Sequence, residues 1–213
     1  MPVGLPKVPF PTLEEDENKN EDKNEDKNED EEEEVECNGL YEQRILILGS
    51  EITSENANIL CGALIYFSLA DSSREFKFFI NSPGGSVIDG IAIYDTIDTL
   101  LAPVETTAVG VAASMACFIL TAGTSRTAFP HARVMMHQPS TSLSDVEMDH
   151  TVMEIQVLEK IRDSIIDGYR KKTSKSRTEI MDALEKDVFL SAIEAKEYRL
   201  VDRIVGENGF EFP

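Results

Sequence analysis

Cysteines and long apolar runs are scarce in this sequence of 213 residues. The three cysteines, Cys37, Cys61 and Cys117, are odd in number and never form a C-x-x-C pair, so they predict neither a disulfide framework nor a zinc site. We therefore expect a reducing compartment and no bound metal. No apolar stretch approaches the roughly 18 to 20 residues that span a bilayer, which argues against a membrane span.

Basic residues are also in the minority, with 20 Lys and Arg against 40 Asp and Glu and a net charge of −20. Because no basic stripe could neutralise phosphates, we expect no nucleic-acid partner. The opening MPVGLPKVPF lacks the basic and apolar regions of a secretory signal and is too short and Pro-rich for a transit peptide. Either the protein works where it is made, or a presequence is missing from this sequence.

The acidic residues are unevenly placed. Residues 14–36 hold 15 acids against 3 Lys, or −12, whereas the rest carries 25 acids and 17 bases, or −8. We predict a Pro-rich N-terminal segment (1–13), an acidic, low-complexity, disordered insertion (14–39), one folded domain (40–206) and a tail (207–213). The insertion has two open interpretations: a tolerated insertion, or an acidic interaction tail or gate over a pore.

Strands and helices alternate through the folded domain. Apolar runs predict strands at 44–48, 77–80, 104–109, 133–136 and 200–205, and helical spacing predicts helices at 53–70, 87–101 and 114–122. This alternation is typical of parallel βαβ units and an α/β fold. Right-handed crossovers then place the turns at 81–86 and 110–114 on the same sheet edge, where the Gly pair meets the serine.

A long amphipathic helix is predicted from Ser144 to Tyr169, with apolar residues stepping by three or four. At ~25 residues it would be about 38 Å long, more than a domain of this size easily covers. We expect part of it to project and to need a partner subunit. Two capping boxes, Ser176 with Glu179 and Ser191 with Glu194, predict two shorter helices after it.

Ser114 lies between a predicted strand end and an apolar helix. A serine there is held on rigid elements, and the free amides of the helix N-terminus point at any oxyanion beside it. The alternative is a simple N-cap, a position that serine favours. A nucleophilic serine also needs a base, an orienting group and oxyanion donors elsewhere in the chain.

His137 is the best candidate for the base, because it ends an apolar strand at the edge where open α/β sheets place their chemistry. His131 follows a proline in a loop, and His150 stands among acids on the long helix. The alternative for His137 is a strand-end histidine paired to a carbonyl. As orienter we favour Asp187, beside an apolar run, with Glu185 as its near rival.

The Gly84-Gly85 pair lets backbone approach a substrate closely, and an amide there could share an oxyanion with that of Met115. The alternative is that Pro-Gly-Gly forms an ordinary turn with no role in a site. Each of these signals is weak alone. The order serine, histidine, aspartate and the predicted sheet edge that they share together favour an acyl-transfer site.

Five ordered motifs, FINSPGGSV, IAIYDT, GVAASMACFILTAG, AFPHARVMMHQP and EKDVFLSA, resemble the Clp protease proteolytic subunit family. The resemblance spans residues 40–205 and looks most like the plastid-encoded form. It implies Ser114 as nucleophile, His137 as base and Asp187 as acid, with oxyanion donors at the amides of Gly85 and Met115. Two positions depart from the family pattern: Ala116 replaces a usual Gly, and Lys186 a usual Arg.

The resemblance also implies a ClpP/crotonase-like fold of repeated ββα units with a projecting handle helix, and two stacked heptameric rings. It implies a serine endopeptidase of the chloroplast stroma that cleaves unfolded proteins to small peptides in protein quality control. The Pro-rich segment would be axial, and a separate AAA+ unfoldase would supply the substrates. No Gly-Lys phosphate loop occurs, so we expect ATP to be used by that partner and no cofactor to be bound here.

Two other functions stay open. One is a catalytically idle structural ring subunit of the same complex, consistent with the two departures from the family pattern. The other is an acyl-CoA enzyme of the crotonase fold, which also uses paired backbone amides but gives Ser114, His137 and Asp187 no joint role.

Overall fold

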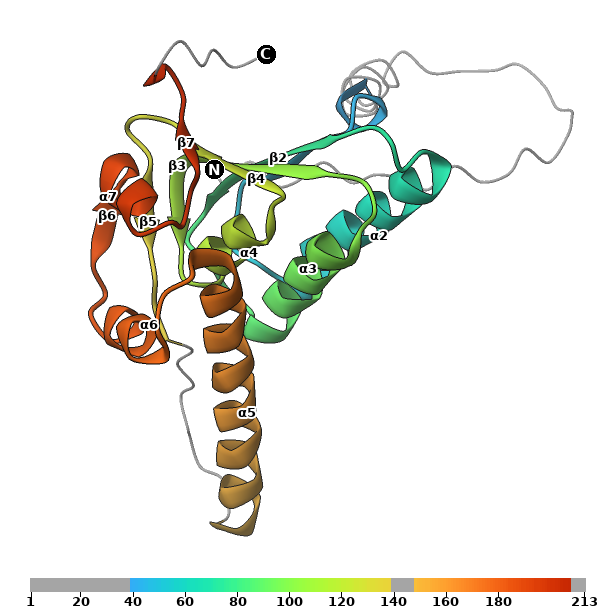
Figure 1. Cartoon of the computed structure of the whole chain (residues 1–213). Coiled ribbons are helices and arrows are strands. Elements are labelled where there is room, and N and C mark those ends of the chain that lie inside the picture. The colour runs from blue at the N-terminus through green and yellow to red at the C-terminus, as the bar shows by residue number, and fades with distance from the viewer. Residues whose placement is uncertain (1–38, 139–147, 208–213) are drawn as a thin grey trace, which may run out of the picture.

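The computed structural model describes residues 39–138 and 148–207 (Figure 1). The Pro-rich segment, almost all of the acidic insertion and most of the tail therefore lie outside the described residues, as does the predicted start of the long helix at Ser144. In the described residues, no helix is long and apolar enough to cross a membrane.

A seven-stranded sheet forms the frame of the domain and confirms the α/β prediction. Its main path is parallel, in the order β1-β2-β3-β4-β7. β5 pairs in parallel with the far end of β3, and β6 pairs antiparallel with β5. The strands are β1 (Ile45–Leu48), β2 (Phe76–Ser82), β3 (Val104–Ala113), β4 (Ser125–Ala128), β5 (Arg133–Met135), β6 (Phe189–Ser191) and β7 (Arg203–Ile204).

Except for α5, whose predicted start lies outside the described residues, the helices begin within one residue of where the sequence predicts them. Both predicted capping boxes are present, Ser176 with Glu179 before α6 and Ser191 with Glu194 before α7, and each serine accepts a hydrogen bond from its glutamate's amide. The helices are α2 (Ser54–Ala70), α3 (Val87–Thr99), α4 (Met115–Ala122), α5 (Met148–Thr173), α6 (Arg177–Leu184) and α7 (Ala192–Glu197).

The structure changes the bounds of two predicted strands and adds two strands. The predicted strand at 104–109 continues to Ala113, because Asn81 Oδ1 accepts a hydrogen bond from the Val111 amide (3.1 Å) beside Gly110, whose φ is 88°. Two short strands, β4 and β6, were not predicted, since three or four residues show little periodicity without their partners. The last strand is only two residues long.

α4 is the centre of the core. Every one of its eight residues is buried, as expected for a helix that is apolar all round. Phe118 stacks on Tyr94 of α3 (ring centroids 4.0 Å apart) and meets Tyr169 of α5 edge-on (5.1 Å). The helix that follows Ser114 is therefore fixed between two other helices.

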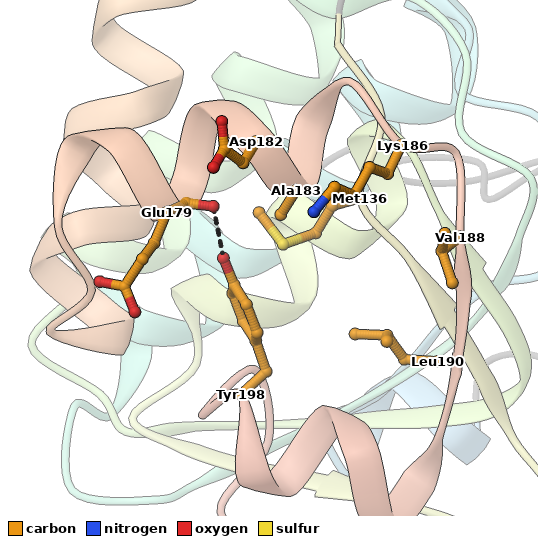
Figure 2. A pocket seen from close by; sticks show the side chains of 8 residues that line it. All are labelled: Met136, Glu179, Asp182, Ala183, Lys186, Val188, Leu190 and Tyr198. Carbon is orange, nitrogen blue, oxygen red and sulfur yellow. Dashed lines mark hydrogen bonds between the residues drawn. The ribbon is translucent and has the colours of Figure 1, made fainter.

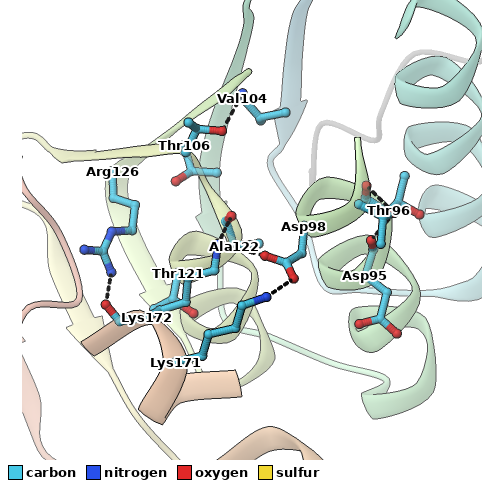
Figure 3. Close-up of polar contacts among 12 residues, drawn as sticks. Asp95, Thr96, Asp98, Val104, Thr106, Thr121, Ala122, Arg126, Lys171 and Lys172 are labelled. Carbon is cyan, nitrogen blue, oxygen red and sulfur yellow. Dashed lines mark hydrogen bonds and ion pairs between the residues drawn. The ribbon is translucent and has the colours of Figure 1, made fainter. Parts of the chain in front are cut away.

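α5 projects from the domain, as predicted (Figure 1). Its C-terminal turns pack on the core through buried Ile165, Ile166 and Tyr169. Polar contacts fix the same end: the Nζ atoms of Lys171 and Lys172 pair with Asp98 of α3, and Lys172 Nζ also donates to the carbonyl oxygen of Ala122 at 2.8 Å (Figure 3). One end of α5 is thus anchored to both α3 and α4.

Candidate active site

Ser114 joins β3 to α4 with an unusual backbone conformation. Its φ is 55° and its ψ is −123°, a region that residues other than glycine rarely occupy. Its amide donates to the carbonyl oxygen of Met135 on β5 (2.8 Å). Although Ser114 stands at the N-cap of α4, its side chain makes no capping hydrogen bond to the described residues. Ser114 is thus the N-cap by position, but its hydroxyl is not used as a cap among the described residues.

The glycine turn after β2 packs directly against this serine, as predicted. A Cβ on Gly84, whose φ is 101°, would lie 2.8 Å from the carbonyl oxygen of Ala113 and 2.9 Å from Ser114 Cβ. A Cβ on Gly85 would lie 2.4 Å from the carbonyl oxygen of Ile52. Both positions therefore need glycine, because any side chain would push the turn away from Ser114 or from Ile52.

The amides of Gly85 and Met115 are candidate oxyanion donors. Met115 opens α4, where the first amides have no partner within the helix. Among the backbone hydrogen bonds of the described segments, none is donated by either amide. Met115 follows Ser114 directly, and Gly85 follows Gly84, the glycine that contacts Ser114.

His137 and Asp187 face each other across neighbouring strands. Met135 pairs with Phe189 in the antiparallel β5–β6 ladder. His137 lies two residues after Met135 and Asp187 two residues before Phe189, so the same register places them opposite each other. His137 Nε2 lies 3.3 Å from Asp187 Oδ1. The Gln138 amide donates to the carbonyl oxygen of Leu184 (3.0 Å), which holds the two chains together beyond the ladder.

The structure distinguishes Asp187 from its rival Glu185. Glu185 pairs with Arg162 of α5, with Oε1 and Nη2 3.4 Å apart, whereas Asp187 pairs with His137. Asp187 has a φ of 47°, in the left-handed region that Asp tolerates better than most residues. Its side chain is 63% exposed, and that of His137 is 28% exposed.

His131 does not join this cluster. His131 is exposed in the turn before β5. His150 lies in the first turn of α5, and its side chain is outside the described residues. The predicted base, His137, is the histidine that the structure places beside a predicted acid.

Strand register brings the serine to the same place. Ala113 pairs with Met135 in the parallel β3–β5 ladder, so Ser114 lies alongside the residue before His137. In the described part of the chain, no hydrogen bond joins the Ser114 hydroxyl to His137.

A cavity of about 350 Å³ is lined by residues of α6, of the segment that runs from α6 into β6, and of the end of α7 (Figure 2). Met136, Lys186 and Val188 line this cavity, whereas His137 and Asp187, their neighbours in sequence, are not among the lining residues. The departure at Lys186 therefore falls on an exposed wall of this cavity rather than in the core. The lining is Met136, Glu179, Asp182, Ala183, Lys186, Val188, Leu190 and Tyr198.

Sequence reasoning missed the strand that places the acid. The apolar run Val188-Phe189-Leu190 is a signal for a strand, but the spacing of residues in the sequence does not show that this strand pairs with β5. The hydrogen bond from Ser114 to the Met135 carbonyl and the ion pair of Arg162 with Glu185 were also not predicted, because each joins residues far apart in the sequence. No group of three or more His, Cys, Asp or Glu side chains suited to a metal occurs among residues 39–138 and the described part of 148–207.

The fold and this cluster define a class: α/β proteins that present a serine at a strand-to-helix turn beside a paired histidine and carboxylate. Comparison with known proteins specifies the family. Residues 28–208 match the Clp protease family. The chain is 43% identical to the ATP-dependent Clp protease proteolytic subunit of Atropa belladonna over 97% of its own length and all of that protein. It is 41% identical to that of Lotus japonicus, with the same coverage, and 43% identical to that of Vitis vinifera, over 96% of this chain and 98% of that one.

The chain therefore belongs to the Clp protease family, and its fold is that of the family. The resemblance read from the five motifs is confirmed.

Proposed function

We propose that this chain is the proteolytic subunit of an ATP-dependent Clp protease and acts as a serine endopeptidase. The observation that supports this most strongly is the convergence of three strand ends: Ser114 after β3, His137 after β5 and Asp187 before β6. Names of full-length relatives at 41–43% identity support the same activity.

In the proposed mechanism, His137 takes the proton of the Ser114 hydroxyl through the imidazole nitrogen that Asp187 does not hold. The Ser114 oxygen then attacks the peptide carbonyl and forms an acyl-enzyme as the amine leaves with that proton. Water, deprotonated by the same imidazole, releases the acyl group. Asp187 keeps the imidazole tautomer fixed and stabilises its charged form.

The amides of Gly85 and Met115 would hold the oxyanion in both steps. Backbone donors fixed before the reaction stabilise developing charge without reorganising, and loss of one donor costs ~3 kcal/mol in comparable sites. The buried position of α4 and the tight packing of Gly84 on Ser114 keep these donors in place.

We further propose stacked heptameric rings of Clp proteolytic subunits, joined through α5, and a separate AAA+ unfoldase that uses ATP and delivers unfolded substrates. The projection of α5 supports a subunit contact there (Figure 1). The plant relatives support a chloroplast stroma location. No cofactor is needed for the proposed chemistry.

One observation favours a second candidate, the idle ring subunit: no hydrogen bond among the described residues joins Ser114 to His137. Labelling of the assembled protein with a fluorophosphonate probe decides between the two, with Ser114→Ala as the matched control. Covalent label that disappears in the variant supports the peptidase. An assembled ring that takes no label supports the idle subunit, and binding of CoA would instead support the acyl-CoA enzyme.

A further inference from the structure

The projecting helix α5 holds α6 at both of its ends. Asp163 of α5 pairs with Arg177, the first residue of α6. The preceding residue, Arg162, pairs with Glu185, the C-cap of α6, with Nη2 and Oε1 3.4 Å apart. Glu185, the acidic partner in the second ion pair, is two residues before Asp187 in the sequence.

The turn that carries Asp187 has little other support. All residues from Glu185 to Phe189 are exposed. The Lys186 amide donates to the carbonyl oxygen of Ala183 at 3.4 Å, and the Leu184 carbonyl accepts from Gln138. Exposed segments with few packed contacts open locally at low free-energy cost. The position of the Asp187 carboxylate therefore depends on the side-chain contacts that fix this turn.

Arg162 is suited to fix it. Its side chain is 34% exposed against 57% for Glu185, and its Nε is buried without a hydrogen-bond partner among the described residues. The guanidinium is a planar, rigid group, so a partly buried stem presents it at a defined place. Glu185, by contrast, gains its position from this contact.

We propose that Arg162 is a positioning residue for Asp187. Through its ion pair with Glu185, it holds the turn after α6 beside His137. This inference rests on the proposed function, because it gives Asp187 the role of orienting the base.

The test is the double variant R162Q/E185Q in the assembled protein, which removes one positive and one negative charge and leaves the net charge unchanged. We expect kcat for a short peptide to fall roughly two- to fivefold, the range for a partly exposed ion pair, with KM unchanged. We also expect faster hydrogen exchange at the amides of residues 186–188. The swapped pair R162E/E185R should restore both readouts.

The matched control is D163N/R177Q, which breaks the ion pair at the other end of α6. It should leave kcat and the exchange at residues 186–188 unchanged. The proposal is overturned if R162Q/E185Q matches the wild type in both readouts, if the control lowers kcat as much, or if the swapped pair restores neither. A wild type without peptidase activity contradicts the proposed function instead, and the exchange comparison then decides the positioning role by itself.

Discussion

Gly84 and Ser114 are in such close contact that a single added carbon would disturb the serine: a Cβ on Gly84 would lie 2.9 Å from Ser114 Cβ. Two segments 30 residues apart in sequence thus share one surface. The contact joins the turn that offers the Gly85 amide to the residue proposed as nucleophile.

Gly84→Ala should therefore impair catalysis. Its φ of 101° is unfavourable for alanine, and the new Cβ would also meet the Ala113 carbonyl at 2.8 Å. A displacement of about 1 Å in such a site costs roughly 100-fold in rate, so we expect a loss of that size in kcat/KM. Gly49→Ala, whose nearest contact would be an ordinary 3.7 Å, is the control. If Gly84→Ala and Gly49→Ala have equal kcat/KM, the contact between Gly84 and Ser114 does not position the serine.

Arg126 and Asp202 make stability depend on pH. Burial alone would raise the pKa of Asp202, but hydrogen bonds and charge from Arg126, with Nε 2.9 Å from Oδ2, outweigh it and hold that pKa below its usual value. A carboxyl whose pKa is lowered by folding contributes stability above its unfolded pKa of about 3.9, and this is lost as the pH falls through the folded value. The urea midpoint should accordingly drop below about pH 4.

Asp202→Asn tests this directly. At pH 7 it should lower the free energy of unfolding by about 1.5–3 kcal/mol, because the buried Arg126 loses a charged partner. The difference in unfolding free energy between variant and wild type should become smaller in acid, because the wild-type carboxyl is then protonated and uncharged, like the Asn amide. Asp167→Asn, in the exposed pair with Arg170, is the control and should have little effect. If this difference in unfolding free energy does not change with pH, the ion pair between Arg126 and Asp202 is not the cause of the pH dependence.

Tyr94 buries a hydroxyl that has no hydrogen-bond partner in the described part of the chain. An unsatisfied buried polar group costs about 1–3 kcal/mol, so Tyr94→Phe should be at least as stable as wild type, with its ring still stacked on Phe118. Tyr169→Phe is the matched comparison. It loses a hydrogen bond to Cys117 and should be destabilised by about 1 kcal/mol. Chemical denaturation that ranks the two variants the other way would contradict this.

Cys117 lies one turn after Ser114 but should not react. Burial raises the pKa of its thiol to about 12, although the hydrogen bond from Tyr169 acts in the opposite direction. The thiolate is the reactive form, so iodoacetamide at pH 8 should leave Cys117 unmodified in the native protein and modify it after denaturation. Peptide mapping by mass spectrometry reads this out. Rapid native labelling of Cys117 would show that α4 is less well packed than described.

Local signals predicted much of this molecule. Capping boxes identified α6 and α7, and apolar runs identified the strands before Ser114 and His137, although the first was predicted to end at Val109 instead of Ala113. The signals failed where a contact comes from a distant part of the chain. β6 is a strand because it pairs with β5, and Glu185 and Asp187 are told apart by their distant partners, Arg162 and His137.

The measurement that tests the central claim most directly is kcat for Ser114→Ala, His137→Ala and the double variant in the assembled protein. Residues that act as one catalytic unit are strongly non-additive, so each single change should cost roughly a millionfold and the double variant should be no worse. Independent losses that multiply in the double variant, or a His137→Ala protein of near-normal rate, would contradict a catalytic unit built from these strand ends.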